Sequence, residues 1–508
     1  MICVIRAART RELNAVHRNS GLKAKLLAAA AGSAITMTGL LGTAVAAPLQ
    51  DGQRAQLLSI VKKQEAPLAS DAIAIWNLAE VGYKETRSSA LLEERLRKHG
   101  FTVRAGVAGI PTAFVASFRT GDGPVIGILA EYDALPGLSQ DAVPNRKPTP
   151  GKDAAHGCGH NLFGAASVAS AIALKDWMVV NGVKGEVRVY GSPAEEGGSG
   201  KVYLVREGLF NDVDAVLHWH PADANGYTVN PTMANISGKF RFHGVSAHAA
   251  GMPEAGRSAL DAVQVMNIAV EHLREHIPDR TRIHYVITSG GKAPNVVPDF
   301  AEVYYYVRQT DPQIVRDVWA RVVKASQGAA IATETTTDFE ITGGVYSMLP
   351  NDALLDVAVR NFSQVPISPW NEEEMAFATE LAKSLPKPGS LTPIPIKPPK
   401  VEEGLNGSTD VSDISWVAPT VGISTTSWVP GSPAHSWQSS AASGSSIGVK
   451  GAFVAAEVLT LMGAELLQSP DVLAKAKAEL MARRGPDFVY KAMLGDRKPA
   501  LDYRDPPK

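Results

Sequence analysis

Short apolar runs, each bounded by Gly, Pro or Asp, alternate with amphipathic stretches along the first half of the chain. Residues 52–100 carry apolar side chains at helical spacing, as at Leu57, Ile60 and Val61, and predict two amphipathic helices. Buried strands are predicted at 113–118, 125–130, 187–190 and 215–217, with a helix at 164–180 between them. Alternating strands and helices favour an α/β fold, in which a parallel or mixed central sheet carries helices on both faces.

The pattern changes near Thr232 and returns near Tyr346. Between them the predicted order is strand, helix, strand, strand, helix, strand, at 235–244, 258–277, 283–288, 301–308, 314–325 and 337–342. This order is typical of a ferredoxin-like α+β domain. Helices predicted at 352–362 and 446–467 then resume the α/β pattern. We therefore expect residues 232–345 to interrupt a first domain made of residues 47–231 and 346–484, with a tail at 485–508.

The amino terminus has the pattern of a secretory signal peptide. Basic residues up to Lys25 precede an uncharged run at 26–47, which ends in the small-residue pattern Ala44-Val45-Ala46. The alternative is an uncleaved membrane anchor, because the run is long enough to span a bilayer. Its Gly, Ser and Thr content favours cleavage, so residues 1–46 are predicted to be a signal peptide. The mature chain is then expected in the periplasm or the medium, without stable membrane insertion.

Composition excludes several classes of protein. Of the 508 residues, 45% are apolar and 20% charged, as in globular proteins rather than disordered or collagen-like ones. The formal net charge of −1 gives no basic field for nucleic acid. Only two cysteines occur, Cys3 and Cys158, which excludes a disulfide framework. Signal cleavage would remove Cys3, so the remaining thiol needs another explanation.

That explanation begins with a Gly-rich turn, His156-Gly157-Cys158-Gly159-His160-Asn161. Thiolate and imidazole are both good ligands for a borderline-soft divalent metal. Taken alone, a buried cysteine beside a turn is an equal alternative. The pair Glu195-Glu196 follows the predicted strand at 187–190, where α/β sheets place their ligands. One carboxylate can hold a metal while the other acts as general base, although a solvated acidic turn is the simpler interpretation of the pair by itself.

Histidines supply the remaining candidates. His218 and His220 end another predicted strand, and we expect one to be a ligand and the other a packed neighbour. His435 lies in a Gly/Ser/Pro loop, where a surface role is the default. Together the segments are far more specific than any one of them. Five potential ligands, Cys158, His160, Glu196, His220 and His435, suit a dinuclear hydrolase site in which metal binding shields the lone thiol from oxidation.

These segments resemble one protein family. The stretch Leu129–Gly137 (Leu-Ala-Glu-Tyr-Asp-Ala-Leu-Pro-Gly), the turn at 156–161, Glu195-Glu196, Gly244–His248 and Gly291–Pro298 are similar to motifs of the aminoacylase/carboxypeptidase metallopeptidases. The similarity extends over residues 53–467 and is to the amidohydrolase branch, which includes hippurate hydrolase. The variants Tyr132 and Asn161 agree with its aminobenzoyl-glutamate hydrolase group and with related dipeptidases. A signal peptide is a departure from the bacterial relatives, which are usually cytoplasmic.

The resemblance implies a role for each matching residue. The five potential ligands would hold two divalent ions, Zn or Mn, and Glu195 would be the catalytic base. Asp133 would orient a ligand, and His248 would stabilise the oxyanion, if need be from a partner subunit. Asn295 and Arg308 are candidates for holding the free carboxylate of the substrate. The inserted domain would be a lid and dimerisation domain, giving a homodimer or a heterodimer with a homologous subunit.

The function expected from the resemblance is hydrolysis of the amide bond in an N-acyl amino acid, with p-aminobenzoyl-glutamate, a folate catabolite, as the leading substrate. A dipeptidase or a general N-acyl-amino-acid amidohydrolase is the near alternative. An exported protein that only binds peptide or metal is the alternative of another class, but such a protein has no need of Glu195. A Ser-His-Asp hydrolase is disfavoured because no Gly-x-Ser-x-Gly occurs between a strand and a helix.

Overall fold

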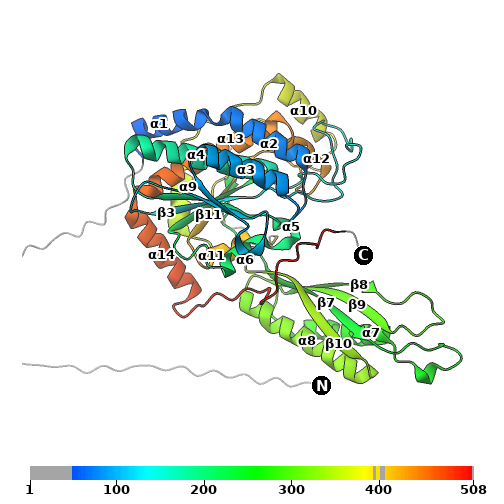
Figure 1. The fold of residues 1–508 in the computed structure, drawn as a ribbon. Helices are drawn as coiled ribbons and strands as arrows, with labels where there is room; N and C mark the ends of the chain where they lie inside the picture. Colours follow the sequence, from blue (N-terminus) through cyan, green and yellow to red (C-terminus); the bar gives the residue numbers. More distant parts are fainter. Residues whose placement is uncertain (1–48, 393–395, 401–406, 506–508) are drawn as a thin grey trace, which may run out of the picture. The chain divides into compact units, whose positions relative to one another are not determined.

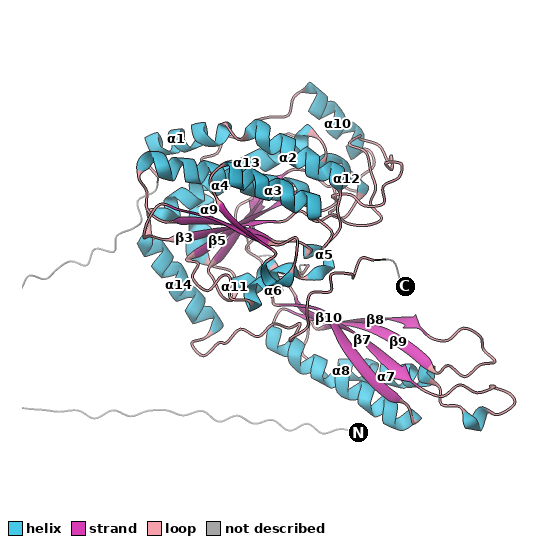
Figure 2. Ribbon diagram, viewed as in Figure 1, coloured by secondary structure: helices cyan, strands magenta, loops and turns pink. Residues whose placement is uncertain are grey.

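A mixed β-sheet with helices on both sides forms the first domain, as the computed structural model shows (Figures 1 and 2). The structure describes residues 49–392, 396–400 and 407–505. The predicted signal peptide at 1–46, and Cys3 within it, lie outside these residues. All described residues belong to one compact unit.

The strand order in the larger sheet is β1-β2-β4-β3-β5-β11-β6. Its centre is parallel, since β3 pairs in parallel with β4 and β5, and β5 with β11. Its edges are antiparallel, through β1–β2–β4 on one side and β6–β11 on the other. The strands are β1 (Thr102–Ala105), β2 (Phe114–Arg119), β3 (Val125–Ala130), β4 (Glu186–Gly191), β5 (Ala215–Ala222), β6 (Gly226–Tyr227) and β11 (Thr420–Thr426).

Helices α1–α4 and α13 cover one face of this sheet, and α6, α11 and α14 lie on the other side (Figure 2). The helices of the domain are α1 (Asp51–Lys62), α2 (Glu65–Leu78), α3 (Thr86–Lys98), α4 (His160–Asn181), α5 (Glu195–Gly198), α6 (Gly200–Arg206), α9 (Asp352–Phe362), α10 (Glu372–Ala382), α11 (Val411–Ser415), α12 (Trp437–Ser443), α13 (Ser446–Leu467) and α14 (Pro470–Arg484), with a 3₁₀ turn, η1, at Val107–Gly109.

The prediction of two helices over 52–100 was wrong, because α1, α2 and α3 divide this fully described stretch into three. The first break lies between Lys62 and Glu65, and Pro67 in the first turn of α2 has no N–H with which to continue the hydrogen bonds of α1. The second follows Leu78, where Ala79 adopts φ of 46° and ends α2. Apolar spacing continues across the first break, so periodicity alone did not reveal it.

Two core helices, α4 and α13, are long and apolar enough to cross a membrane by length and composition. Their most apolar windows are 78% and 89% buried inside the protein, respectively. Buried helices are apolar on every side, because protein surrounds them. In this fold α4 and α13 pack on each other and on the central strands.

The inserted segment forms a second, four-stranded sheet with the order β10-β7-β9-β8, in which every neighbouring pair is antiparallel. Together with its two main helices, this confirms the ferredoxin-like prediction. We call residues 232–345 the lid domain, after the role that the family resemblance implies. Its elements are β7 (Ala234–His243), α7 (Ala259–Leu273), β8 (Arg282–Ser289), β9 (Phe300–Gln309), α8 (Pro312–Thr333) and β10 (Thr336–Val345), with 3₁₀ turns η2 (Pro253–Ala255) and η3 (Arg274–His276).

The parallel centre of the larger sheet gathers the candidate residues at one edge. Asp133 follows β3, Glu195 and Glu196 follow β4, and His220 lies near the end of β5. Because these strands run in the same direction, their carboxyl ends meet at one edge, where open α/β sheets bind their ligands.

Candidate active site

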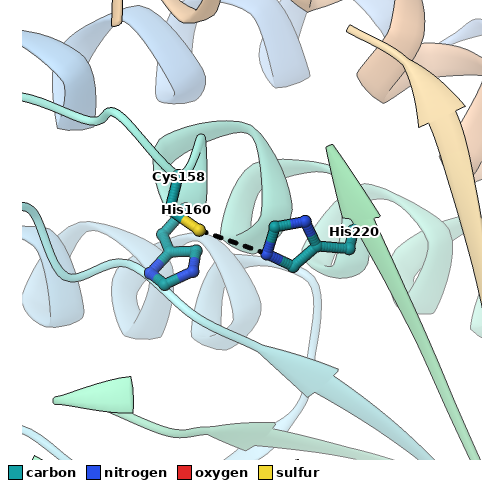
Figure 3. A group of neighbouring side chains, drawn as sticks. All are labelled: Cys158, His160 and His220. Atoms are coloured by element: carbon teal, nitrogen blue, oxygen red, sulfur yellow. Dashed lines mark hydrogen bonds between the residues drawn. The ribbon is translucent and has the colours of Figure 1, made fainter. Parts of the chain in front are cut away.

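The turn before α4 presents Cys158 and His160 to the carboxyl edge of the sheet. Gly159 has φ of +75°, a conformation that favours glycine, and a Cβ atom there would come within 2.8 Å of Pro221. Figure 3 shows Cys158 and His160 on this turn facing His220 of β5. The Sγ atom of Cys158 lies 3.4 Å from Nε2 of His220.

Loops far apart in sequence complete the cluster. Nε2 of His435 lies 3.0 Å from Oε1 of Glu196, and the backbone N–H of His435 donates to Gly157 O at 3.0 Å. The donor atoms form three groups, in each of which all lie within 4.8 Å of one another: Cys158, His160 and His220; Cys158, Glu196 and His435; His160, Glu195 and Glu196. Cys158, His160 and Glu196 each belong to two of these groups, an arrangement that suits neighbouring ions with shared donors.

Asp133 links two of these donors. Its Oδ1 lies 2.9 Å from Nδ1 of His160, and its Oδ2 accepts a hydrogen bond of 3.0 Å from the backbone N–H of Glu196. Nδ1 of His220 likewise lies within hydrogen-bond distance of a partner, the carbonyl oxygen of Pro221 at 2.7 Å. Metal-binding histidines are usually held through their second ring nitrogen in this way, which fixes the direction of the other.

The chemistry of these donors fits a pair of divalent metals. Nε2 of His160 and Oε2 of Glu131 are buried and 3.1 Å apart, yet neither makes a hydrogen bond. Burial and repulsion from His160 lower the pKa of His220 to about 4, so its imidazole is neutral and able to bind metal. Burial raises the pKa of the Cys158 thiol, and a bound cation would reverse this by stabilising the thiolate.

The carboxylates of the site have different affinities for protons. Burial and the adjacent charge of Glu196 raise the pKa of Glu195 well above its usual value. Burial alone would raise the pKa of Asp133 as well, but the neighbouring His160 lowers it to about 2. A carboxylate with a raised pKa suits proton transfer, whereas one with a low pKa suits permanent charge.

Arg308 reaches this site from the lid domain. It lines a cavity of about 170 Å³ together with Glu195, Glu196 and Tyr306. Its guanidinium carbon lies 5.1 Å from the centre of the Tyr306 ring, and its Nε is buried without a hydrogen bond. The structure therefore places Arg308 in the wall of the cavity that the paired glutamates also line.

His248 and Asn295 lie elsewhere in the lid domain. Both side chains are exposed, and neither lines the cavity beside Glu195. The Ala249 N–H donates to Asn295 O at 3.0 Å, so the two residues occupy neighbouring loops. Nδ1 of His248 accepts from the N–H groups of Ala250 at 3.2 Å and Gly251 at 3.1 Å. This leaves Nε2 to carry the proton of the neutral ring and to donate outward.

His218 does not join the donor cluster. It is buried on β5, and its pKa is lowered to about 3 by burial and by His220. A Cβ atom at Gly422 would come within 2.2 Å of its ring, so His218 fills the space that this glycine leaves on the neighbouring strand.

Sequence reasoning missed a buried charge network behind the donors. The fully buried ammonium of Lys201 lies 2.7 Å from Oε1 of Glu131 and 2.7 Å from Oδ1 of Asp410. The other oxygen of Glu131 is the one that faces His160. Only the position of Lys201 just after the Glu195-Glu196 loop hints at this role, and nothing in the local pattern marks Asp410.

Comparison with known proteins identifies the family. Residues 232–334 match the model of the peptidase dimerisation domain of the M20 family. The chain is 40% identical over 434 residues to one subunit of the p-aminobenzoyl-glutamate hydrolase of Escherichia coli, covering 80% of this chain and 90% of that protein. The chain is a member of the M20 peptidase family.

Other similar proteins agree with this assignment. An Xaa-Arg dipeptidase of Mus musculus is 28% identical over 75% of this chain and 83% of its own length. The crystal structure of a dinuclear metal-binding M20 peptidase from Bacillus subtilis matches with a TM-score of 0.56 at 17% identity, over 80% of this chain and 99% of that one. This M20 chain is therefore a hydrolase of the metallopeptidase and amidohydrolase type, and its site is one for divalent metals.

Proposed function

We propose that this M20 hydrolase cleaves the amide bond of p-aminobenzoyl-glutamate to give p-aminobenzoate and glutamate. The observation that carries the proposal is the shared cavity of Glu195, Glu196 and Arg308. It combines a base, a metal donor and a cation suited to a free carboxylate. The 40% identity to a hydrolase of this substrate supports the choice of acyl group and amino acid.

The residues of the chain divide the chemistry among them. Metals bound by the five donors would polarise the amide carbonyl and acidify a water molecule. Glu195 accepts the proton of the attacking water and delivers it to the leaving nitrogen. Arg308 pairs with the free carboxylate of glutamate and so fixes the position of the amide. Cys158 and the imidazole donors favour zinc by softness, although manganese fits the same donor set.

A dimer completes this proposal. Strand β8 is an edge of the lid sheet and exposes Tyr285, Val286 and Ile287, and the neighbouring helix α7 exposes Val265 and Ile268. An apolar edge strand with unpaired backbone groups is a ready surface for a second copy. We propose a homodimer through this surface, in which the partner subunit's His248 donates its Nε2 proton to the oxyanion. A heterodimer with a homologous chain is the alternative, because the Escherichia coli hydrolase has two differently named subunits and both are similar to this chain.

We also propose that the protein is exported. The support is the basic start, the uncharged run at 26–47 and its small-residue end. Amino-terminal sequencing of the protein from a periplasmic fraction would find Ala47 or Pro48 first if this is correct. A first residue at Met1 in the cytosolic fraction would contradict it.

The experiment that tests the function is release of p-aminobenzoate from p-aminobenzoyl-glutamate by the purified mature chain. The protein is loaded separately with Zn²⁺ and Mn²⁺, and Glu195→Gln is the control. Release by the unmodified chain that falls by at least about 10³-fold in the control would support the proposal, since the general base is lost. Full metal occupancy without release would contradict this substrate, and the same assay with dipeptides, including Xaa-Arg, would test the alternative.

A further inference from the structure

The C-terminal segment, residues 485–505, contacts the loop at 194–199, which carries the candidate metal donor Glu196. We call residues 194–199 the donor loop. At its start the Tyr490 hydroxyl donates to Asp413 at 2.6 Å, and Met493 and Leu494 are 2% exposed. Further on, Arg206 of α6 donates to Arg497 O at 2.8 Å. The segment is therefore anchored along its length and does not behave as a loose tail.

The end of this segment reaches the loop that carries the paired glutamates. The Tyr503 hydroxyl donates to Glu196 O at 3.0 Å, and the Arg504 guanidinium donates to the same carbonyl. Asp505 then forms an ion pair with Lys84 at 2.8 Å, which fastens the chain just beyond these contacts. Two side chains from the C-terminal segment thus hold the backbone of one metal donor.

The loop needs such support because its backbone is unfavourable. Ala194 and Ser199 have φ of 58° and 57°, values at which a side chain is crowded, and Gly197 has φ of 92°. Its polar groups are held by partners outside the loop. Glu85 accepts from the Ala194 N–H at 2.9 Å, and the Tyr83 hydroxyl donates to Gly198 O at 2.8 Å.

Tyr503 fits its place closely. Its ring meets that of Tyr83 edge to face, with 5.5 Å between ring centres. A Cβ atom on Gly82 would come within 2.1 Å of the Tyr503 hydroxyl, so this glycine leaves room for it. The two tyrosines therefore hold two carbonyls of the same loop, at Glu196 and Gly198.

We infer that Tyr503 and Arg504 are positioning residues for the metal donor Glu196. Bonds to its carbonyl fix the peptide between Glu196 and Gly197, and with it the direction of the Glu196 side chain toward His435 and Cys158. Asp133 holds the N–H of the same residue at 3.0 Å, so both peptide groups of Glu196 are fixed. This inference rests on the metal site of the proposed function, and it is independent of the substrate.

The test compares metal binding by the full mature chain with that of Tyr503→Phe, Arg504→Gln and the double variant. Binding of Mn²⁺ and Zn²⁺ is measured by competition with a chelator, and metal content by elemental analysis. We expect one of the two ions to bind about 10–100-fold more weakly in the double variant. Arg504→Lys should bind this ion more tightly than Arg504→Gln does, because lysine restores a charged donor.

Tyr190→Phe is the matched control. Its hydroxyl also donates to a backbone carbonyl, that of Leu209 at 2.8 Å, which is not a carbonyl of the loop that carries Glu196. We expect this variant to bind both ions as the unmodified chain does. Thermal unfolding of all variants shows whether a loss of metal affinity merely follows a loss of stability.

The outcomes separate this inference from the metal site itself. Two ions bound with unchanged affinity by both single variants and by the double variant would overturn the positioning role. An unmodified chain that binds no divalent ion would overturn the metal site together with the inference. If the double variant fails to fold, a selective loss of one ion in Tyr503→Phe, with no loss in Tyr190→Phe, still supports the role.

Discussion

At the scale of single residues, the site depends on groups that do not themselves belong to the donor cluster. Asp133 forms hydrogen bonds with both His160 and the backbone of Glu196. The adjacent His160 imidazole lowers the pKa of Asp133 and so keeps this carboxylate ionised. Behind the same histidine, the buried ammonium of Lys201 pairs with the carboxylates of Glu131 and Asp410. The geometry of the donors is therefore set by buried ionic partners, whose loss costs more than a surface contact would.

Replacing Asp133 with Asn tests this dependence. The amide cannot accept strongly at both positions, so His160 and Glu196 lose a common anchor. We expect metal affinity to fall about 10–100-fold, measured by chelator competition. Asp153→Asn is the control, because this exposed carboxylate also accepts from a backbone N–H, that of Gly137 at 3.1 Å. Equal metal affinities in the two variants would contradict the role of Asp133.

A second residue gives a pH dependence that does not involve the metal site. Glu457 on α13 is 8% exposed, and burial raises its pKa from 4.5 to about 7. Between these values the unfolded chain releases the proton while the folded chain keeps it, so this group lowers stability as pH rises. We expect Glu457→Gln to unfold with a free energy about 1–3 kcal/mol higher at pH 8 and nearly unchanged at pH 4.

Urea unfolding at the two pH values measures this difference. Glu373→Gln, which removes an exposed carboxylate in the first turn of α10, is the control and should show little change at either pH. A Glu457→Gln variant whose stability gain is the same at pH 4 and pH 8 would show that burial of this carboxyl is not the cause.

At the scale of elements, the turn before α4 shows how local backbone conformation builds the site. Periodicity predicted the helix from Gly164, but the helix begins at His160, directly after the left-handed Gly159. The turn therefore projects Cys158 and His160 from the first residues of a buried helix, which holds them rigidly. Close contact with Pro221 brings the same turn against the end of β5.

Alanine at Gly159 tests the turn, and alanine at Gly137 is the matched control. Both glycines have positive φ, +75° and +73°, but a Cβ atom at Gly137 meets open space. We expect Gly137→Ala to cost about 1–2 kcal/mol of unfolding free energy from backbone strain alone. Gly159→Ala should cost about 2–4 kcal/mol, because overpacking adds to the strain, and should also lower metal content. Equal costs in urea unfolding would contradict the contact with Pro221.

At the scale of the whole molecule, the described residues of one chain do not bring every predicted catalytic group to one place. Glu195 and Arg308 line a common cavity, whereas His248 lies in an exposed loop that does not reach it. In a dimer of the proposed kind, the lid domain of each subunit would bring its His248 to the active site of the other subunit. The exposed apolar edge at β8 and α7 supplies a surface for such a dimer.

Mixing two inactive variants tests this arrangement. Glu195→Gln and His248→Ala are unfolded together, refolded together and assayed for amide hydrolysis. If His248 acts in the partner's site, half of the dimers are mixed and each contains one intact site, so activity should recover to about a quarter of the unmodified level. Each variant refolded alone is the control. No recovery, with mixed dimers demonstrated by differently tagged chains, would contradict a shared site.

Most of the fold was predictable because its signals are local. The helices at 352–362 and 446–467 and the strand at 125–130 have the predicted bounds, since each is a clear apolar pattern between turn residues. The break between α1 and α2 was missed because the apolar spacing continues across it. The candidate donors were predicted only from the combination of their segments, because each segment by itself has a simpler interpretation.

The residues that support the donors could not be predicted in the same way. Lys201 and Asp410 are 209 positions apart in sequence, and Tyr503 is 307 positions from Glu196. Their roles exist only because the folded chain brings them together. Ordinary spacing of Lys, Asp or Tyr along a chain carries no such signal.

The sequence by itself determined the α/β class and the inserted ferredoxin-like domain, because apolar periodicity is a local property of the chain. It also predicted the candidate donors, through residue chemistry and the family resemblance. Only the tertiary structure decided which histidine of the pair 218 and 220 faces Cys158, that Arg308 lines the same cavity as the paired glutamates, and that the C-terminal segment holds Glu196. The physical reason is that side-chain direction, burial and long-range hydrogen bonds depend on packing between distant segments, which no local pattern records.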